Sequence, residues 1–183
     1  MFSSDEAGTI TTDITEGFST STSASSGNNS ITFNTLDDGT YSGKTITVTD
    51  AAGNANSLTI PDFVIETVAP TMTISSATVS NGDTSNDDSI SLTFTSNEAT
   101  TNFVVGDVTV SGGSLSNFAA SSTSVYKATF TPSSAGATSI DVAASVFTDA
   151  AGNGNTAASQ FTWTYDNSSA ELSNVIISSN NAT

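Results

Sequence analysis

Several residue types are missing from this sequence or nearly so. It has no histidine, cysteine or arginine, and its only basic residues are Lys44 and Lys127. These absences exclude Ser-His and Cys-His nucleophile pairs, zinc sites built on His or Cys, and disulfide bonds. Nucleic acid and anionic membranes both require clustered Lys or Arg, so we expect neither as a partner. The formal net charge of −16 makes divalent cations more plausible ligands.

Long apolar runs are absent as well. No segment approaches the ~20 apolar residues of a transmembrane helix, and no cationic region followed by an apolar one marks a signal peptide at Met1. We therefore expect no membrane insertion, and we expect secretion to depend on a part of the protein outside these 183 residues. Leu, Ile, Val and Phe make up only about a fifth of the chain, but they alternate with Ser and Thr over short segments. That pattern predicts half-buried β-strands and an all-β fold.

Two internal repeats divide the chain. The hexapeptide Thr-Asp-Ala-Ala-Gly-Asn occurs at residues 49–54 and 148–153, about 100 positions apart, the length of one immunoglobulin-like sandwich. Each copy lies between two apolar segments, so we predict a tight loop joining two late strands. A second pattern, Phe-x-Ser-x-Glu-Ala, ends a predicted strand at residues 2–7 and 94–99. Because less of the fold precedes the first copy, we expect the first module to lack its opening strand and most of its second.

The repeats predict tandem immunoglobulin-like β-sandwich domains with boundaries near two junctions. Residues 1–66 form an Ig-like domain lacking its first strands, residues 67–166 a complete one, and residues 167–183 a linker with the first strand of a following domain. Pro70 fixes the backbone at the first junction. The predicted strands are residues 8–13, 29–34, 44–49 and 57–65, a weaker one at 19–24, and then 71–75, 89–96, 102–105, 107–111, 114–119, 125–131, 139–144 and 160–165.

The opening-strand segment at residues 171–179 has two interpretations. An incomplete sandwich exposes unpaired backbone groups and an open core, which a soluble protein rarely tolerates. The segment could complete the first module of a neighbouring chain as a donor strand, and such a head-to-tail contact propagates into filaments. The alternative is a disordered stub of a longer natural chain.

Four motifs in order resemble one family. They are Phe-x-Ser-x-Glu-Ala at residues 94–99, Phe-Val-Val-Gly-Asp-Val-Thr-Val-Ser-Gly-Gly at 103–113, Tyr-x-Ala-x-Phe-Thr-Pro at 126–132 and Phe-Thr-Asp-Ala-Ala-Gly-Asn at 147–153. Together they resemble the bacterial Ig-like tandem repeats of giant surface adhesins, of the biofilm-associated and type-one-secreted kind. The resemblance implies an extracellular or cell-surface spacer. The family junction Asp-Thr-x-Ala-Pro corresponds to residues 66–70, whereas residues 166–170 lack its proline, which puts a stiff bend there in doubt.

The acidic loops predict calcium sites at the domain junctions. Calcium takes about six to eight oxygen ligands, from carboxylates, amides and backbone carbonyls. In an Ig-like sandwich the loop after the second strand and the loop between the last two strands lie at the end where the chain enters. We therefore expect two ligand sets, Glu66, Glu98, Asp149 and Asn153 for the second module, and Glu6, Asp50 and Asn54 with a linker residue like Asp166 of a preceding module for the first. In the alternative, each Asp caps its own turn and binds no metal.

The predicted function is structural and adhesive. Adjacent acid pairs on exposed turns point apart, so we do not expect a glycosidase-type carboxylate pair or any enzyme activity. The expected partners are further copies of the chain. A glycan-binding module of a secreted protein is the alternative, with surface glycans as ligands. Exposure of Trp163 or Tyr165 would favour it, because an exposed ring can stack on sugar, and burial would count against it. The structural interpretation places Phe161, Trp163 and Tyr165 in the sandwich core.

Overall fold

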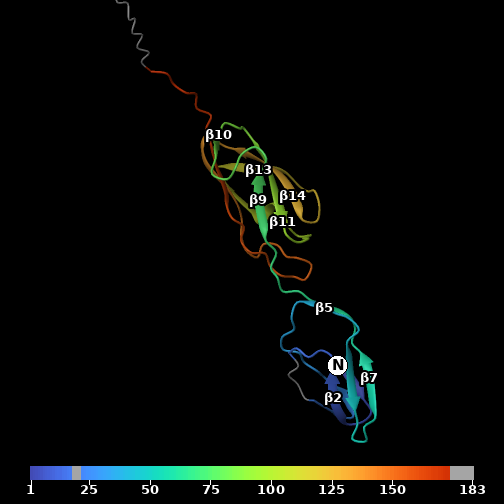
Figure 1. The fold of residues 1–183 in the computed structure, drawn as a ribbon. Coiled ribbons are helices and arrows are strands. Elements are labelled where there is room, and N and C mark those ends of the chain that lie inside the picture. Colours follow the sequence, from blue (N-terminus) through green and yellow to red (C-terminus); the bar gives the residue numbers. More distant parts are fainter. Residues whose placement is uncertain (18–21, 174–183) are drawn as a thin grey trace, which may run out of the picture. The chain divides into compact units, whose positions relative to one another are not determined.

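The computed structural model describes residues 1–17 and 22–173, and the chain forms two compact units, Met1–Thr67 and Val68–Thr183 (Figure 1). Apart from one short 3₁₀ turn at Val105–Asp107, every regular element in the described ranges is a β-strand. The prediction of an all-β fold is therefore confirmed. A search of the described residues for a helix of membrane-spanning length and hydropathy finds none.

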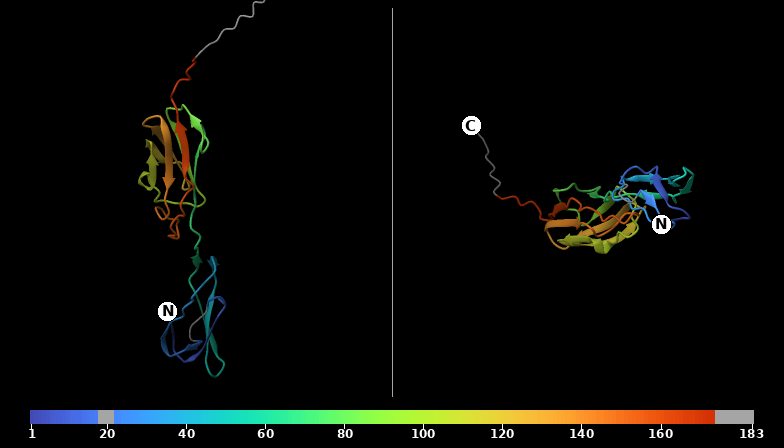
Figure 2. Two further views of the ribbon diagram at one scale, coloured as in Figure 1. Left: turned by 90° about the vertical axis from the view of Figure 1, so that its left-hand side faces the viewer. Right: turned by 90° about the horizontal axis from the view of Figure 1, so that it is seen from below.

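The second unit is a sandwich of two four-stranded sheets. Its strands are β9 (Met72–Ser76), β10 (Thr84–Ser85), β11 (Ile90–Ser96), β12 (Val108–Ser111), β13 (Gly113–Ala120), β14 (Val125–Pro132), β15 (Gly136–Val142) and β16 (Phe161–Tyr165). One sheet has the order β13-β14-β11-β9 and the other β10-β16-β15-β12. All neighbours are antiparallel except β10 and β16. This order is that of an immunoglobulin-like sandwich, and Figure 2 shows its strands running along a common direction.

The core of the second unit follows from alternation along the strands. Every second residue of β11 and of β16 is buried, as expected when one face of each sheet packs against the other. Phe94 and Phe130 are 0% exposed and Trp163 is 1% exposed. Full burial of one such side chain stabilises a fold by about 1.5–3 kcal/mol. These aromatic rings therefore supply much of the stability of the unit, and the sandwich-core interpretation of the last strand is confirmed.

Two local features of the second unit differ from the sequence prediction. The strand expected at residues 102–105 does not form, because the Asp107 carboxylate accepts the amide of Val104 at 2.8 Å and closes a 3₁₀ turn instead. The short strand β10 was not expected. It exists only through its parallel pairing with β16, a contact between segments far apart in the sequence.

The first unit has shorter strands and a smaller core. Its strands are β1 (Phe2–Ser4), β2 (Gly8–Thr12), β3 (Ser23–Ala24), β4 (Gly27–Asn29), β5 (Gly39–Tyr41), β6 (Thr45–Thr49), β7 (Ala55–Thr59) and β8 (Phe63–Ile65). They form the sheets β1-β4, β3-β2-β6-β7 and β5-β8. The apolar residues buried among its described residues are Ile10, Ile14, Ala24 and Tyr41. Tyr41 also stacks on Phe63 with ring centroids 4.9 Å apart.

Some strand predictions in the first unit were wrong. The strand predicted at residues 29–34 ends at Asn29, whose side chain bonds the backbone of Ser25 on both its donor and acceptor sides and forms a turn. The strand predicted at residues 57–65 is split into β7 and β8 near Pro61, which has no amide hydrogen to donate. The weak strand predicted at residues 19–24 survives only as β3, and residues 18–21 lie outside the described ranges.

Candidate functional site

The repeated loop of the second unit is capped by its own aspartate. One carboxylate oxygen of Asp149 accepts the amides of Gly152 at 2.7 Å and Asn153 at 2.9 Å. The other accepts the Asn153 side-chain amide at 2.9 Å. Gly152 has a φ of +96°, which glycine adopts without strain. The hydrogen bonds of the turn-capping interpretation are therefore present, and the residue Asp149 is 8% exposed.

The first unit repeats this turn almost bond for bond. One oxygen of Asp50 accepts the amides of Ala52 and Asn54, each at 2.8 Å, and the other accepts the Asn54 side chain at 2.8 Å. Hydrogen bonds from the Asn54 side chain, then from its backbone amide, lower the pKa of Asp50 below its ordinary value. The two hexapeptides thus fix the same local geometry, and each presents one carboxylate in an ordered loop.

The structure brings Glu98 to Asp149, as predicted. Glu98 follows β11, Asp149 precedes β16, and each offers a carboxylate oxygen within 4.8 Å of the other. Two unit charges at that distance repel by about 1 kcal/mol in water and by about 3.5 kcal/mol at an effective dielectric of ~20. Asp149 is buried and Glu98 half-buried, so a cation at this point would relieve a real repulsion.

Sequence reasoning missed the residue that joins these two loops. The Asn102 side chain accepts the amide of Thr148 at 3.1 Å and donates to the Thr148 hydroxyl at 3.2 Å, directly before Asp149. Asn102 lies four residues after Glu98, in a segment predicted as a strand. No sequence motif marks it, because its partner is 46 residues away. Its role is to position both acidic loops.

The chain enters the second unit at the same end. The Asn97 side chain accepts the amide of Thr71 at 2.6 Å, and the carbonyl of Pro70 accepts the amide of Thr156 at 2.9 Å. These contacts fix the residues before β9 against the loops that carry Glu98 and Asp149. The prediction that both loops lie beside the entering chain is confirmed within this unit.

The predicted ligands of the first unit also lie together. Glu6, Asp50 and Asn54 line one surface hollow of about 300 Å³, together with Asp5. Glu6 and Asn54 are exposed, whereas Asp50 is half-buried by its turn. This hollow therefore gathers the carboxylates of Asp5, Glu6 and Asp50 and the side-chain amides of Asn54 and Asn56 on the described part of the first unit.

The two predicted linker ligands take different places. Glu66 directly follows β8, at the end of the first unit. Asp166 directly follows β16, at the end of the sheet where Tyr165 pairs with Gly136, opposite to the end that carries Asp149. Asp166 accepts hydrogen bonds from the hydroxyl of Ser168 and then from its amide, and these lower the pKa of Asp166. The structure therefore does not add Asp166 to the Glu98–Asp149 pair.

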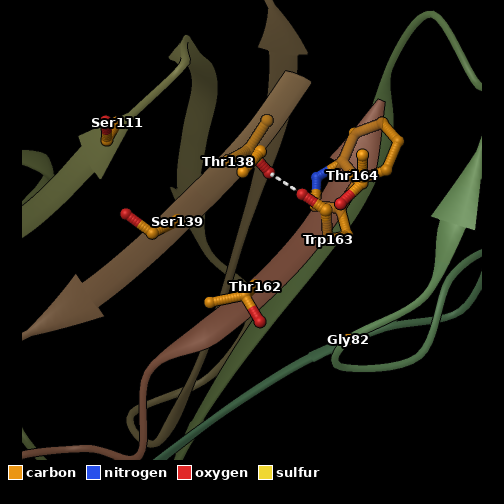
Figure 3. A pocket seen from close by; sticks show the side chains of 8 residues that line it. Gly82, Ser111, Thr138, Ser139, Thr162, Trp163 and Thr164 are labelled. Carbon is orange, nitrogen blue, oxygen red and sulfur yellow. Dashed lines mark hydrogen bonds between the residues drawn. The ribbon is translucent and has the colours of Figure 1, made fainter. Parts of the chain in front are cut away.

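A second hollow lies on the outer face of the β12-β15-β16 sheet (Figure 3). It measures about 370 Å³, and most of its lining residues are Ser and Thr, among them Ser139 and Thr162. The Thr138 hydroxyl donates to the Trp163 carbonyl at 2.9 Å, and the Trp163 indole nitrogen is buried without a partner in the described part of the chain (Figure 3). With Trp163 and Tyr165 buried, this face offers no aromatic platform to a sugar.

Comparison with known families accounts for the second unit. A family model described as the bacterial Ig-like domain matches residues 66–165, more than half of the chain. No curated protein matches the sequence. The matched residues contain all eight strands of the sandwich and the paired carboxylates at its entry end. The chain therefore belongs to the bacterial Ig-like domain family.

Proposed function

We propose that this chain is a non-enzymatic structural module of an extracellular or cell-surface adhesive array, in which stacked units supply length and backbone ladders bear load. The observation that carries the proposal is the second unit, a complete sandwich of the bacterial Ig-like family with a dense aromatic core. The Ser- and Thr-rich outer faces and the charge of −16 support it, because both keep a long extracellular array wetted and limit unspecific association.

The proposed joints between units bind calcium. At the second unit, Glu98 and Asp149 supply carboxylate oxygens, Asn153 an amide oxygen and Glu66 a further carboxylate from the linker. At the first unit, Glu6, Asp50 and Asn54 supply the same groups, and a residue equivalent to Asp166 comes from a preceding module. Turn capping and ion binding are compatible, because a carboxylate has about four lone-pair sites. An ion here offsets the repulsion between Glu98 and Asp149 and stiffens the linker.

The proposed array grows head to tail by strand donation. The donor segment predicted at residues 171–179 lies mostly outside the described ranges, which end at residue 173. Its partner is a second copy of the chain. An exposed edge in the first unit supports this part of the proposal, and its geometry is developed below.

A thermal melt with and without calcium tests the ion sites. Trp163 is the only tryptophan of the chain and lies in the core of the second unit, so its fluorescence follows that unit alone, whereas far-UV circular dichroism follows both. Calcium at about a hundred times its Kd adds roughly 2.7 kcal/mol, which corresponds to a rise of about 10 °C in the Trp163 transition. Magnesium, which prefers octahedral geometry with several waters, serves as the control cation.

Each result has a definite meaning. A calcium-specific rise in the Trp163 transition supports the ion-stiffened joint. Superimposed melts in calcium and chelator would reduce Asp149 to a turn cap and overturn this part of the proposal. A glycan array probed with the same protein is expected to show no binding, and specific binding there would favour the glycan-binding alternative.

A further inference from the structure

One groove of the first unit adjoins the acidic hollow, and Asp5, Val48 and Asn56 border both. It measures about 250 Å³ and lies between β1 on one side and β6 and β7 on the other. Its lining is mixed, with apolar side chains from Phe2, Ile46, Val48 and Leu58 and polar ones from Ser3, Ser4, Asp5, Asn56 and Ser57. Leu58 is 56% exposed, and every residue of β7 is exposed. The inner faces of these strands thus open to solvent where a sandwich core is expected.

The second unit shows which element closes the equivalent position. The Phe-x-Ser-x-Glu-Ala pattern begins in β1 at Phe2 and in β11 at Phe94. Each of these strands has an antiparallel neighbour on one side, β4 for β1 and β14 for β11, in which Asn29 lies opposite Phe2 and Tyr126 opposite Phe94. On its other side, β11 pairs with β9. In the described ranges β1 pairs only with β4, so the edge corresponding to β9 carries no strand.

β9 closes the core of the second unit with two side chains. Met72 and Ile74 are 4% and 9% exposed, and they pair across from Ser96 and Phe94 of β11. Met72 and Ile74 belong to the same buried core cluster as Phe161 of β16, which places them between the two sheets. The intervening Thr73 is exposed. The groove of the first unit borders β1, which pairs only with β4 in the described ranges, so a strand added beside β1 as β9 is beside β11 would carry two inward residues, two positions apart.

The sequence of this chain contains a second strand of that pattern. Met72-Thr-Ile-Ser-Ser in β9 corresponds to Val175-Ile-Ile-Ser-Ser at residues 175–179, which lie outside the described ranges. In the β9 register, Ile177 takes the position opposite Phe2 and Val175 the position opposite Ser4. Residues 172–183 contain no charged side chain in a chain of net charge −16. Such a segment enters a groove of another acidic copy without like-charge repulsion.

We propose that the groove between β1 and β7 is the acceptor site for residues 175–179 of a second copy of this chain, which add a β-strand to the free edge of β1. Backbone hydrogen bonds hold the strand, and the side chains of Val175 and Ile177 fill the groove. This inference rests on the proposed head-to-tail array and names its acceptor site. It does not require calcium.

Two variants of the full-length chain separate the acceptor from the donor. Leu58→Glu places a charge in the groove at a residue that is already exposed, so the free unit is expected to stay folded. Ile177→Asp places a charge on the donor segment. Matched controls are Val64→Glu, at a residue 65% exposed outside the groove, and Ile176→Asp, at the donor position that corresponds to exposed Thr73.

Sedimentation velocity in chelator gives the readout. The unmodified chain and both controls are expected to form a series of oligomers that grows with concentration. Leu58→Glu and Ile177→Asp are each expected to remain monomeric. When the two are mixed, the intact donor of the first meets the intact groove of the second, and the mixture forms a dimer that does not grow.

Three results would overturn the inference. They are a monomeric unmodified chain at all concentrations, an equimolar mixture that stays monomeric while the unmodified chain assembles, and equal effects of Ile176→Asp and Ile177→Asp. Because the experiment is done in chelator, its failure leaves the calcium joint standing. Conversely, superimposed calcium melts leave the strand contact standing.

Discussion

Removal of the Asp149 carboxylate measures how much the repeated turn contributes to stability. In Asp149→Ala, the amides of Gly152 and Asn153 lose their acceptor, and so does the Asn153 side chain. A buried donor without an acceptor costs about 1–3 kcal/mol. Gly152 is exposed and Asn153 half-buried, so water replaces part of the loss. We therefore expect the low end of this range, about 1 kcal/mol for each amide, and a total loss of about 2 kcal/mol in chelator.

The expected loss lowers the Tm of the second unit by about 8 °C, at ~4 °C per kcal/mol for a unit of this size. Asp149→Asn retains one carbonyl oxygen as acceptor but loses the charge that strengthens these bonds, and its expected loss is about half as large. Trp163 fluorescence in chelator is the assay, because it reports the second unit alone. Asp50→Ala removes the matching turn of the first unit and is the control that should leave the Trp163 transition unchanged.

The calcium arm of this experiment separates the cap from the ligand. If Asp149 also binds calcium, Asp149→Asn removes most of the calcium-dependent rise as well as its share of the turn. An Asp149→Ala protein that melts like the unmodified chain in chelator would refute the argument from the turn hydrogen bonds. A Trp163 transition that moves equally in Asp50→Ala would refute the independence of the two units.

Three further predictions follow from the packing and the titratable groups. Gly113→Ala should lower the Tm followed by Trp163 fluorescence by about 4–12 °C. A Cβ at this position would lie 2.4 Å from the Phe130 ring and from the Thr131 carbonyl oxygen, and such overpacking costs about 1–3 kcal/mol. Gly106→Ala is the control and should leave this Tm unchanged, because a Cβ there meets only open space. Because the pKa of Asp50 is lowered in the folded chain, the ionised carboxylate stabilises the first unit at pH values above its ordinary pKa near 3.8. This stabilisation is lost as the pH falls through the lowered pKa. Circular dichroism melts in acid should therefore show a loss of first-unit stability in the unmodified chain that is absent in Asp50→Asn, which lacks the carboxylate at every pH. The hydrogen bond from the Tyr165 hydroxyl to the Asp88 carboxylate raises the pKa of Tyr165, so this bond stabilises the second unit below the ordinary pKa near 10 and is lost as the pH rises through the raised pKa. Tyr165→Phe should therefore make the Tm of the second unit depend less on pH in alkaline solution. An equal dependence in the variant and the unmodified chain would contradict this.

The sequence predicted those elements whose cause is local. In β11 and β16, alternation of apolar and polar residues is enough, because a strand buried on one face has a period of two. The repeated hexapeptide predicted its own turn for a similar reason: the acceptor aspartate, the glycine of positive φ and the donor asparagine lie within five residues. The approach of Glu98 to Asp149 was predicted from the topology of the sandwich, not from any property of the two residues.

The sequence did not predict features that depend on distant partners. The Asn102 bonds to Thr148 and the pairing of β10 with β16 join segments far apart in the chain, and no local pattern marks them. β5 lies between the strands predicted at residues 29–34 and 44–49, where no strand was predicted, and it is a strand because it pairs with β8. Buried Asn155 is a similar case, since its side chain bonds the backbone of Ala143 and of Val146 across a loop.

The central claim is that the first unit is an Ig-like module with an open edge at β1 and β7, which a strand of a second copy closes. Hydrogen exchange of the intact chain in chelator, followed by mass spectrometry at low and high protein concentration, tests it most directly. The account predicts that β9 and β11 are protected at both concentrations, whereas β1 and residues 175–179 gain protection only at high concentration. Equal exchange of β1 and of residues 175–179 at both concentrations, while the protein is assembled, would contradict it.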